Sequence, residues 1–466
     1  MPVVRFIAEG VGPFEKLDVD FSDGHGNPHP GPHILAGVNG SGKSTLLRAI
    51  AWVMDRGQHG FPNQEWQHFL RGHPQSRAFV VLEAPGRPLC GYACTTDTAG
   101  GWFERLQDWV RPFLPSPGSA DIGLSVPRTA ATYSWARFVR GQDPAQQDLF
   151  SIAAYAPSRA LSYVDEPDLR RSLVDPTKNC LAFDSTIQNE AIQAWLIGLF
   201  SKRALAKERK QSFDSYTQSL CRFQSALEQV SDQPVRFDVQ IEPSLQPQFH
   251  ISGQTLNFSQ LADGVRVTVG WLADFMMRQD LTKWDESLGG KRPGLLLLDE
   301  VDIYLHPRWQ RTLLPAMRKA LPDVQIIASS HSPFVISSCP DSRVHVLEVD
   351  ERGRAHARPP VDAPFGQSVT ATLKDIFEVR SRFDIQTERD LDTWNDLKRK
   401  EASGALRPAE KKRLERLTRD LSERNEELRL LVNSPPKLSR RLVESLVVGE
   451  TGASKRSRRP PQRIAG

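Results

Sequence analysis

The chain has 466 residues, of which 39% are hydrophobic and 25% are charged, and its formal net charge is +4. This composition suits a globular protein of two or three domains and excludes a largely disordered one. There is no apolar run of the ~20 residues that would cross a bilayer and no signal-peptide pattern, and the five cysteines are scattered. We therefore expect a cytoplasmic protein with free thiols and no membrane contact.

The N-terminal region predicts strands that lead into a phosphate-binding loop. Residues 17–21 alternate between apolar and charged side chains, the period of a half-buried strand. A short apolar strand at 33–36 then precedes residues 37–44, which match G-x-x-x-x-G-K-[ST] in full before a helical pattern. Backbone N–H groups and the helix N-terminus favour phosphate, while Lys43 can reach the β- and γ-phosphates and Ser44 can bind Mg²⁺. The predicted nucleotide-binding residues are Gly37, Asn39, Gly40, Ser41, Gly42, Lys43, Ser44 and Thr45.

The middle of the chain predicts an insertion between parts of a sheet. Residues 57–150 are rich in Gly, Pro and Trp, and we expect a peripheral part of the nucleotide-binding sheet there, with a strand at 78–82. A strand is predicted at 151–155, helical structure from 189 to 230, and a strand at 235–241 that returns the chain to the sheet. Five basic residues lie in the first half of the helical stretch: Lys202, Arg203, Lys207, Arg209 and Lys210. They form either a solvated face or a contact to DNA phosphates, and the sequence leaves both open.

Acidic residues and a histidine follow two later apolar runs. Leu295-Leu296-Leu297-Leu298 precedes Asp299-Glu300, which predicts a buried parallel strand with carboxylates at its C-terminal end. A helix is predicted at 308–321, and a strand at 324–328 leads to Ser329-Ser330-His331. Ligands bind at this edge of open α/β sheets, so a phosphate and a metal ion would account for the pattern.

Four motifs in this order resemble those of an ABC-type ATPase head. Residues 37–44 correspond to Walker A, Leu261-Ala262-Asp263-Gly264 to the signature, residues 295–300 to Walker B, and His331 to the switch histidine. Residues 299–310, with Leu305-His306-Pro307-Arg308-Trp309-Gln310, resemble the RecF/OLD-like branch and the ATPases of Septu and some retron anti-phage systems. The resemblance implies an α/β P-loop NTPase head, with a mixed central sheet flanked by helices, an inserted helical lobe and a C-terminal helical extension.

The same resemblance implies a catalytic role for three side chains. Glu300 would polarise the attacking water, His331 would contact the γ-phosphate, and Lys43 would bind the phosphates. Asp299 would bind Mg²⁺ together with Ser44. ATP and Mg²⁺ are therefore the expected cofactors.

The signature motif departs from the usual pattern. Two protomers of such heads close head to tail, so Asp263 and Gly264 would contact nucleotide bound by the partner in a homodimer or higher oligomer. Ala262 stands where a serine is usual, so slow or partner-dependent hydrolysis is expected. No glutamine is assigned to the Q-loop, and the resemblance would put residues 156–159 in the equivalent place.

The C-terminal third predicts helices. Residues 340–466 lack the acidic strand pattern of the nuclease found in OLD-type enzymes and show no HNH-like cluster. Helices are predicted at 370–379 and 387–400, followed by one long charged helix and a basic tail at 455–461. The long helix would carry its leucines on one face: Leu414, Leu417, Leu421, Leu428 and Leu431. We expect four regions: the N-terminal part of the head at 1–160, a mainly helical lobe at 161–255, the C-terminal part of the head at 256–350 and a helical extension at 351–466.

These features lead to a functional hypothesis and two alternatives. The resemblance implies a Mg²⁺-dependent ATPase that dimerises over ATP, binds DNA and regulates a separate nuclease, with an HNH-type nuclease favoured, in anti-phage defence. A RecF-like DNA repair ATPase without a nuclease partner is the alternative. A transporter ATPase fits less well, because residues 305–307 and the long insertion do not suit it.

Overall fold

The computed structural model describes residues 2–55, 76–82, 90–95, 105, 108–109, 150–157, 175–242, 244–284, 286–379 and 383–433. The chain divides into two compact units between Gln367 and Ser368, and each is described by itself. The expectations for most of residues 57–150 and for the basic tail at 455–461 lie outside the described residues. In the described ranges, no helix has the length and apolar character needed to span a membrane.

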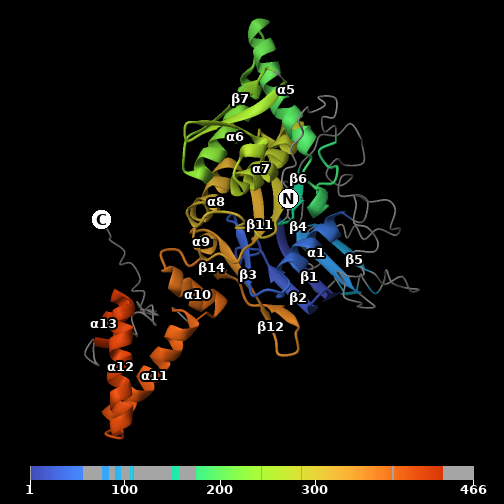
Figure 1. Ribbon diagram of the computed structural model, residues 1–466. Helices are drawn as coiled ribbons and strands as arrows, with labels where there is room; N and C mark the ends of the chain where they lie inside the picture. The colour runs from blue at the N-terminus through green and yellow to red at the C-terminus, as the bar shows by residue number, and fades with distance from the viewer. Residues whose placement is uncertain are drawn as a thin grey trace, which may run out of the picture. The chain divides into compact units, whose positions relative to one another are not determined.

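A mainly parallel sheet forms the centre of the first unit, in the order β13-β12-β3-β11-β10-β6 (Figure 1). The strands from β12 to β6 run parallel, and two short strands pair antiparallel with β12. Strands β3, β6 and β10 are buried along their whole length, as their continuous apolar runs predict. The strands are β3 (His33–Gly37), β6 (Ser151–Tyr155), β10 (Gly294–Leu298), β11 (Val324–Ser329), β12 (Arg343–Val349), β13 (Ala355–Ala357) and β14 (Val361–Asp362).

A second, antiparallel sheet packs on the helix that follows the phosphate loop. Its order is β2-β1-β4-β5, and residues 17–20 alternate between buried and exposed positions as predicted. The predicted strand at 78–82 is β4, but it pairs with β1 rather than with the nucleotide-binding sheet, so that expectation was wrong. Helix α1 (Lys43–Asp55) shares one buried core with both sheets. The strands are β1 (Val3–Val11), β2 (Phe14–Asp20), β4 (Arg77–Leu82) and β5 (Cys90–Thr95).

Helices and a small sheet form the described part of the range predicted as the inserted lobe. The helical pattern from 189 to 230 is two helices, α5 (Asn189–Glu208) and α6 (Asp214–Ser231), separated at Lys210, whose φ is 55°. Strand β7 (Val235–Gln240) does not return to the central sheet as predicted. It forms a hairpin with its neighbour in sequence, β8 (Gln246–Ile251), and β9 (Gln254–Asn257) completes a separate sheet.

Three further helices belong to the first unit. Helix α7 (Asp263–Leu281) begins at the signature motif, α8 (Pro307–Ala320) follows the acidic pair, and α9 (Pro333–Ile336) follows His331. Short 3₁₀ turns lie at Phe183–Ser185, Phe258–Gln260 and Glu286–Leu288. Strands β13 and β14 continue the central sheet beyond residue 350, so the first unit extends past the boundary predicted there.

The second unit has helices with a core of their own. The predicted long helix is interrupted at Asn425, whose extended backbone ends α12 and whose side chain accepts a hydrogen bond from Leu428 N, 2.8 Å away, at the start of α13. The leucines predicted to share a face pack with Leu391, Trp394 and Leu397 of α11. The helices are α10 (Val369–Phe377), α11 (Ile385–Ala402), α12 (Pro408–Arg424) and α13 (Glu426–Asn433).

Two histidines are buried together between β3 and β12. His33 Nδ1 lies 3.0 Å from His345 Nε2, and neither ring is exposed by more than 1%. Burial lowers the pKa of both imidazoles, that of His345 to about 3, and the positive charge of Arg343 acts in the same direction. Both side chains are therefore neutral in the folded protein at neutral pH.

We predict that mild acid destabilises the first unit through this pair. In the unfolded chain both histidines regain a pKa of about 6.5, so below that pH the unfolded state binds more protons than the folded state. The free energy of unfolding should then fall by up to about 1.4 kcal/mol per pH unit for each histidine. Urea unfolding between pH 7.5 and 5 measures the slope. His345→Gln should flatten it, whereas His25→Gln, in an exposed turn, should not. Equal slopes in all three proteins would contradict this account.

Candidate nucleotide-binding site

The predicted site residues follow the ends of three neighbouring parallel strands. Strand β11 lies between β3 and β10, and its register pairs Ala328 with Leu298 and Ser329 with Leu35. The phosphate loop, the acidic pair and the switch histidine therefore start from one edge of the sheet. This confirms the expectation that the two apolar runs are adjacent strands.

The conformation of the phosphate loop depends on the side chain of Lys43 and on the glycine at position 42. Lys43 Nζ donates hydrogen bonds to Gly37 O and Val38 O, each 2.9 Å long. Burial lowers the pKa of Lys43, and the neighbouring carboxylates of residues 299, 300 and 302 oppose this effect. Gly42 has a φ of 94°, and a Cβ at this position would lie 2.4 Å from Phe14 Cζ. Only glycine fits at this turn into α1.

The donors and acceptors of this loop fit a nucleotide with Mg²⁺. Among the described residues, the buried Ser41 Oγ has no hydrogen-bond partner, which leaves it available for a phosphate oxygen. Ser44 Oγ donates to Asp299 Oδ1 at 2.9 Å, so a hydroxyl and a carboxylate, both ligands that Mg²⁺ prefers, lie side by side. Asn39 and Gly40 are exposed in the loop, and Thr45 lies in the first turn of α1.

Ser329 holds the acidic pair in place, a role the sequence analysis did not assign. Its Oγ donates to Asp299 Oδ1 at 2.6 Å and accepts from Glu300 N at 2.7 Å, and the residue is fully buried. Glu300 has a φ of 45°, a left-handed conformation that costs a non-glycine residue about 1–3 kcal/mol. The bond from Ser329 to its backbone therefore stabilises the strained conformation of Glu300.

His331 lies in the same electrostatic environment. Partial burial lowers the pKa of His331, as does the positive charge of Lys43, while Asp302 and Asp299 act in the opposite direction. The imidazole is therefore neutral at neutral pH and can donate one N–H to a phosphate oxygen.

Asp302 was not predicted as a site residue, although it lies three positions after Asp299. Its buried Oδ1 has no hydrogen-bond partner in the described part of the chain.

The signature residues are not part of this cluster. Asp263 and Gly264 begin α7, and no hydrogen bond or ion pair joins them to residues 37–45 among the described residues. A Cβ on Gly264 would lie 2.4 Å from Tyr304 O, so this glycine allows α7 to approach the turn after Glu300. Ala262 occupies the N-cap position and supplies no side-chain hydrogen bond to the helix.

A buried ion pair within α7 accepts a hydrogen bond from the last residue of β6. Arg278 Nε donates to Asp274 Oδ2 at 2.6 Å, and Tyr155 OH donates to the same oxygen at 2.7 Å. Gln188 N, directly before α5, donates to Asp274 Oδ1 at 3.2 Å. The region predicted to replace the Q-loop begins here, but Ser158 and Arg159 lie outside the described residues.

We predict that Ser329→Ala lowers the turnover number about tenfold or more, with little change in ATP affinity. It removes two hydrogen bonds that position Asp299 and Glu300, and a buried bond contributes about 1 kcal/mol or more. Steady-state hydrolysis and binding of a fluorescent ATP analogue measure the two quantities. Ser151→Ala, which removes a buried hydroxyl bonded to Pro293 O away from the site, is the control. Equal turnover in the two variants would contradict the role of Ser329.

Two profiles of known protein families match the chain. Residues 209–337 match the family described as "AAA domain, putative AbiEii toxin, Type IV TA system". Residues 6–77 match a family described as "AAA domain". The second match contains the phosphate loop, and the first contains the signature residues, the acidic pair and His331.

Two individual proteins, from retron and Septu systems, are also similar to the chain in sequence. The chain is 22% identical over 386 residues to "Retron Vc95 probable ATPase" of Vibrio cholerae serotype O1 biovar El Tor, covering 73% of each protein. It is 35% identical over 115 residues to "Septu protein PtuA" of Bacillus thuringiensis, covering 22% of this chain and 29% of that protein. The solved structure "Crystal structure of the SmcHead bound to the C-winged helix domain of ScpA" aligns with 78% of this chain and 98% of its own, with 12% identity and a TM-score of 0.44. The chain is therefore a P-loop ATPase, and its similarity to the retron and Septu proteins confirms the resemblance predicted from its motifs.

Proposed function

We propose that this chain is a Mg²⁺-dependent ATPase of anti-phage defence, which dimerises head to tail over ATP and regulates a separately encoded nuclease. The proposal of a dimer rests on one observation. Among the described residues of one chain, no hydrogen bond or ion pair joins the signature residues to the phosphate loop. Asp263 is 67% exposed and pairs only with Arg266 of its own helix among the described residues. A second copy would bring this residue and Gly264 to the nucleotide and complete the site.

Different side chains of one protomer would then perform different parts of ATP hydrolysis. Glu300 accepts a hydrogen bond from the attacking water and orients it toward the γ-phosphate. Lys43 and the neutral His331 donate hydrogen bonds to phosphate oxygens on which negative charge develops. Ser44 and Asp299 would hold Mg²⁺, which supplies positive charge to the β- and γ-phosphate oxygens.

The nuclease partner is proposed from the resemblance to the ATPases of Septu and retron anti-phage systems and from the C-terminal unit. The described residues of this unit are helices whose leucines pack on Trp394, in place of the acidic strands of a nuclease. Trp394 Nε1 also donates to Thr418 Oγ1 at 2.9 Å and fixes α11 against α12. Such a helical unit can serve as a docking element for another protein.

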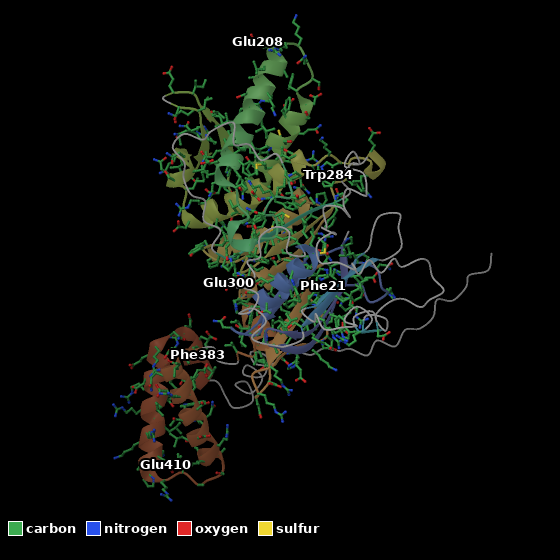
Figure 2. All side chains as sticks on the ribbon, turned by 90° about the vertical axis from the view of Figure 1, so that its right-hand side faces the viewer. Phe21, Glu208, Trp284, Glu300, Phe383 and Glu410 are labelled. Carbon is green, nitrogen blue, oxygen red and sulfur yellow. The ribbon has the colours of Figure 1, made fainter. Side chains whose placement is uncertain are left out.

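The far end of α5 is the proposed DNA contact. Residues 191–199 of this helix are largely buried, while residues 202–210 are mostly exposed, so the basic half extends away from the core. Figure 2 places Glu208 at this far end, and a helix of 20 residues is about 30 Å long. No ion pair within the described ranges neutralises the four exposed cations Lys202, Lys207, Arg209 and Lys210. Clustered cations of this kind bind phosphate backbones without reading sequence.

This basic end also supports the second candidate function, a RecF-like repair ATPase that binds DNA and has no nuclease partner. Both functions need ATP binding and DNA contact. They differ in what the ATP-bound dimer associates with, and co-purification of the trapped dimer from cells with the native operon distinguishes them.

We predict that Glu300→Gln traps an ATP-bound dimer. The substitution leaves the phosphate loop intact but removes the carboxylate that orients water, so the dimer persists. Light scattering with ATP and Mg²⁺ should show twice the 52.3 kDa mass of the chain. Adding Asp263→Lys, an exposed change, should keep ATP binding and abolish the dimer. A Glu300→Gln protein that binds ATP but stays monomeric would show that dimerisation is wrong.

The trapped protein also tests the partner. Purified under ATP from cells that carry the native operon, it should co-elute with a nuclease in stoichiometric amount. A dimer that binds DNA and recruits no nuclease would favour the repair function instead.

We predict that replacing Lys202, Lys207, Arg209 and Lys210 by alanine weakens DNA binding more than tenfold. Each lost phosphate contact should also reduce the slope of log K against log salt by about 0.9. Fluorescence anisotropy at several salt concentrations measures both values. The control replaces four exposed cations of α12, Lys411, Lys412, Arg413 and Arg416, by alanine. If the control loses as much affinity as the α5 variant, α5 is not the DNA contact.

A further inference from the structure

The segment after the acidic pair contains a motif that the proposed chemistry leaves without a role, Leu305-His306-Pro307-Arg308-Trp309-Gln310. We propose that Gln310 is a positioning residue that couples the turn after Glu300 to the loop that carries His331. The inference rests on the proposed function of the chain, because it concerns how the two catalytic side chains respond to the same nucleotide.

Both polar atoms of the Gln310 side chain, Nε2 and Oε1, make hydrogen bonds. Nε2 donates to Leu305 O at 2.9 Å and to Asp302 O at 3.3 Å, so it closes the turn that follows Glu300. Oε1 accepts a hydrogen bond from Ser332 Oγ at 2.6 Å, directly after His331. One side chain therefore bridges two loops that leave different strands, β10 and β11.

Each loop is fixed to further structure beyond this bridge. Ser332 is 6% exposed, and its Oγ caps α9 by accepting from Phe334 N at 3.1 Å and Val335 N at 3.4 Å. On the other side, the turn contains Tyr304, with a φ of 61° and a carbonyl oxygen that faces Gly264. A displacement of the His331 loop would therefore act on the backbone against which the signature glycine packs.

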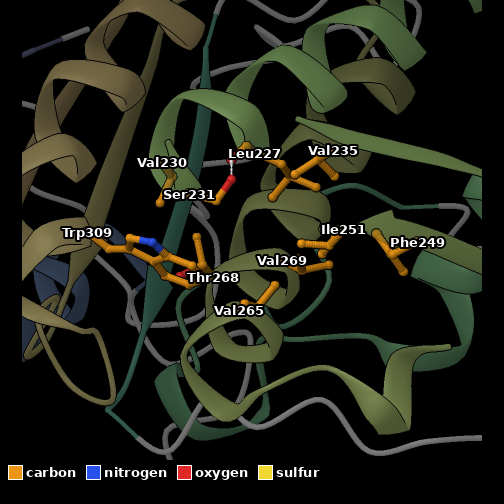
Figure 3. A pocket seen from close by; sticks show the side chains of 10 residues that line it. All are labelled: Leu227, Val230, Ser231, Val235, Phe249, Ile251, Val265, Thr268, Val269 and Trp309. Carbon is orange, nitrogen blue, oxygen red and sulfur yellow. Dashed lines mark hydrogen bonds between the residues drawn. The ribbon is translucent and has the colours of Figure 1, made fainter. Parts of the chain in front are cut away.

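The rest of the motif fixes the helix that presents Gln310. His306 Nδ1 accepts from Arg308 N at 3.2 Å as the N-cap of α8, and Pro307 occupies the first turn. Trp309 lines an apolar pocket with Val265 and Thr268 of α7, and Figure 3 shows it beside Thr268. Because these contacts hold α8 without the Gln310 amide, a change at Gln310 should break the bridge and leave the helix in place.

The consequence for the proposed dimer is a link between its two nucleotides. His331 contacts the γ-phosphate of its own chain, whereas Gly264 meets the nucleotide of the partner. The bridge through Ser332, Gln310 and the turn joins these two contacts within one protomer. Occupation of one site is thereby transmitted to the other by a contiguous set of hydrogen bonds and packing contacts.

Hydrogen exchange of backbone amides, followed by mass spectrometry, tests the bridge in the Glu300→Gln protein, which hydrolyses ATP slowly. With ATP and Mg²⁺, exchange should slow at least tenfold in peptides 300–306 and 329–337. Adding Gln310→Met should keep this protection in 329–337 and reduce it to less than threefold in 300–306. Adding Gln325→Met is the matched control, because Gln325 also uses both ends of its amide, accepting from Val3 N at 2.7 Å and donating to Val3 O at 2.9 Å. It should leave both peptides protected.

Two outcomes would overturn the bridge: protection of both peptides in the Gln310→Met protein, or the same loss with Gln325→Met. A second measurement needs no nucleotide. Exchange of peptide 300–306 in Gln310→Met, Ser332→Ala and the double variant should be non-additive if the bridge exists. Additive effects would overturn it. Non-additive effects in a protein that ATP does not protect would retain the bridge and reject the proposed function.

Discussion

The position of β11 between β3 and β10 controls the rest of the nucleotide site. The phosphate loop leaves one of these strands and the acidic pair leaves the other, so the residue at the end of β11 lies between the two strands from which they start. Ser329 fills that position, and Asp299 Oδ1 accepts one hydrogen bond from it at 2.6 Å and another from Ser44 at 2.9 Å. Three elements that are distant in sequence are thereby joined at a single carboxylate oxygen, which explains why the site is ordered around Asp299 rather than around the loop alone.

The same edge carries groups whose charges oppose one another. Burial lowers the pKa of Lys43 and of His331, while the acidic side chains nearby act in the opposite direction. Lys43 also lowers the pKa of His331, so two cations are not favoured together here, and the histidine is neutral beside the charged lysine. In the proposed mechanism the two donors therefore have different tasks: the lysine supplies positive charge, and the histidine supplies a directional hydrogen bond.

Much of this site could be predicted from local patterns, because the motif residues and the apolar strands before them are contiguous in sequence. The role of Ser329 could not, since it depends on which strands are neighbours, and serine at a strand end has no specific meaning. The pairing of β7 with β8 was missed for a similar reason, because alternation shows that a strand exists and not which sheet it joins. The end of α12 at Asn425 was not predicted, because the leucine spacing continues across it. Only the hydrogen bond from Leu428 N to the Asn425 side chain shows that a new helix begins there.

The leucine core of the C-terminal unit has a consequence for how such a protein can diversify. Because Leu414, Leu421 and Leu428 are buried against residues of the same unit, their packing places no demand on the sequence of the ATPase head. If this unit docks a partner as proposed, its exposed positions can change without disturbing the leucine core. The surface that such a partner would recognise can therefore be altered by substitutions that leave the fold of the helical unit intact.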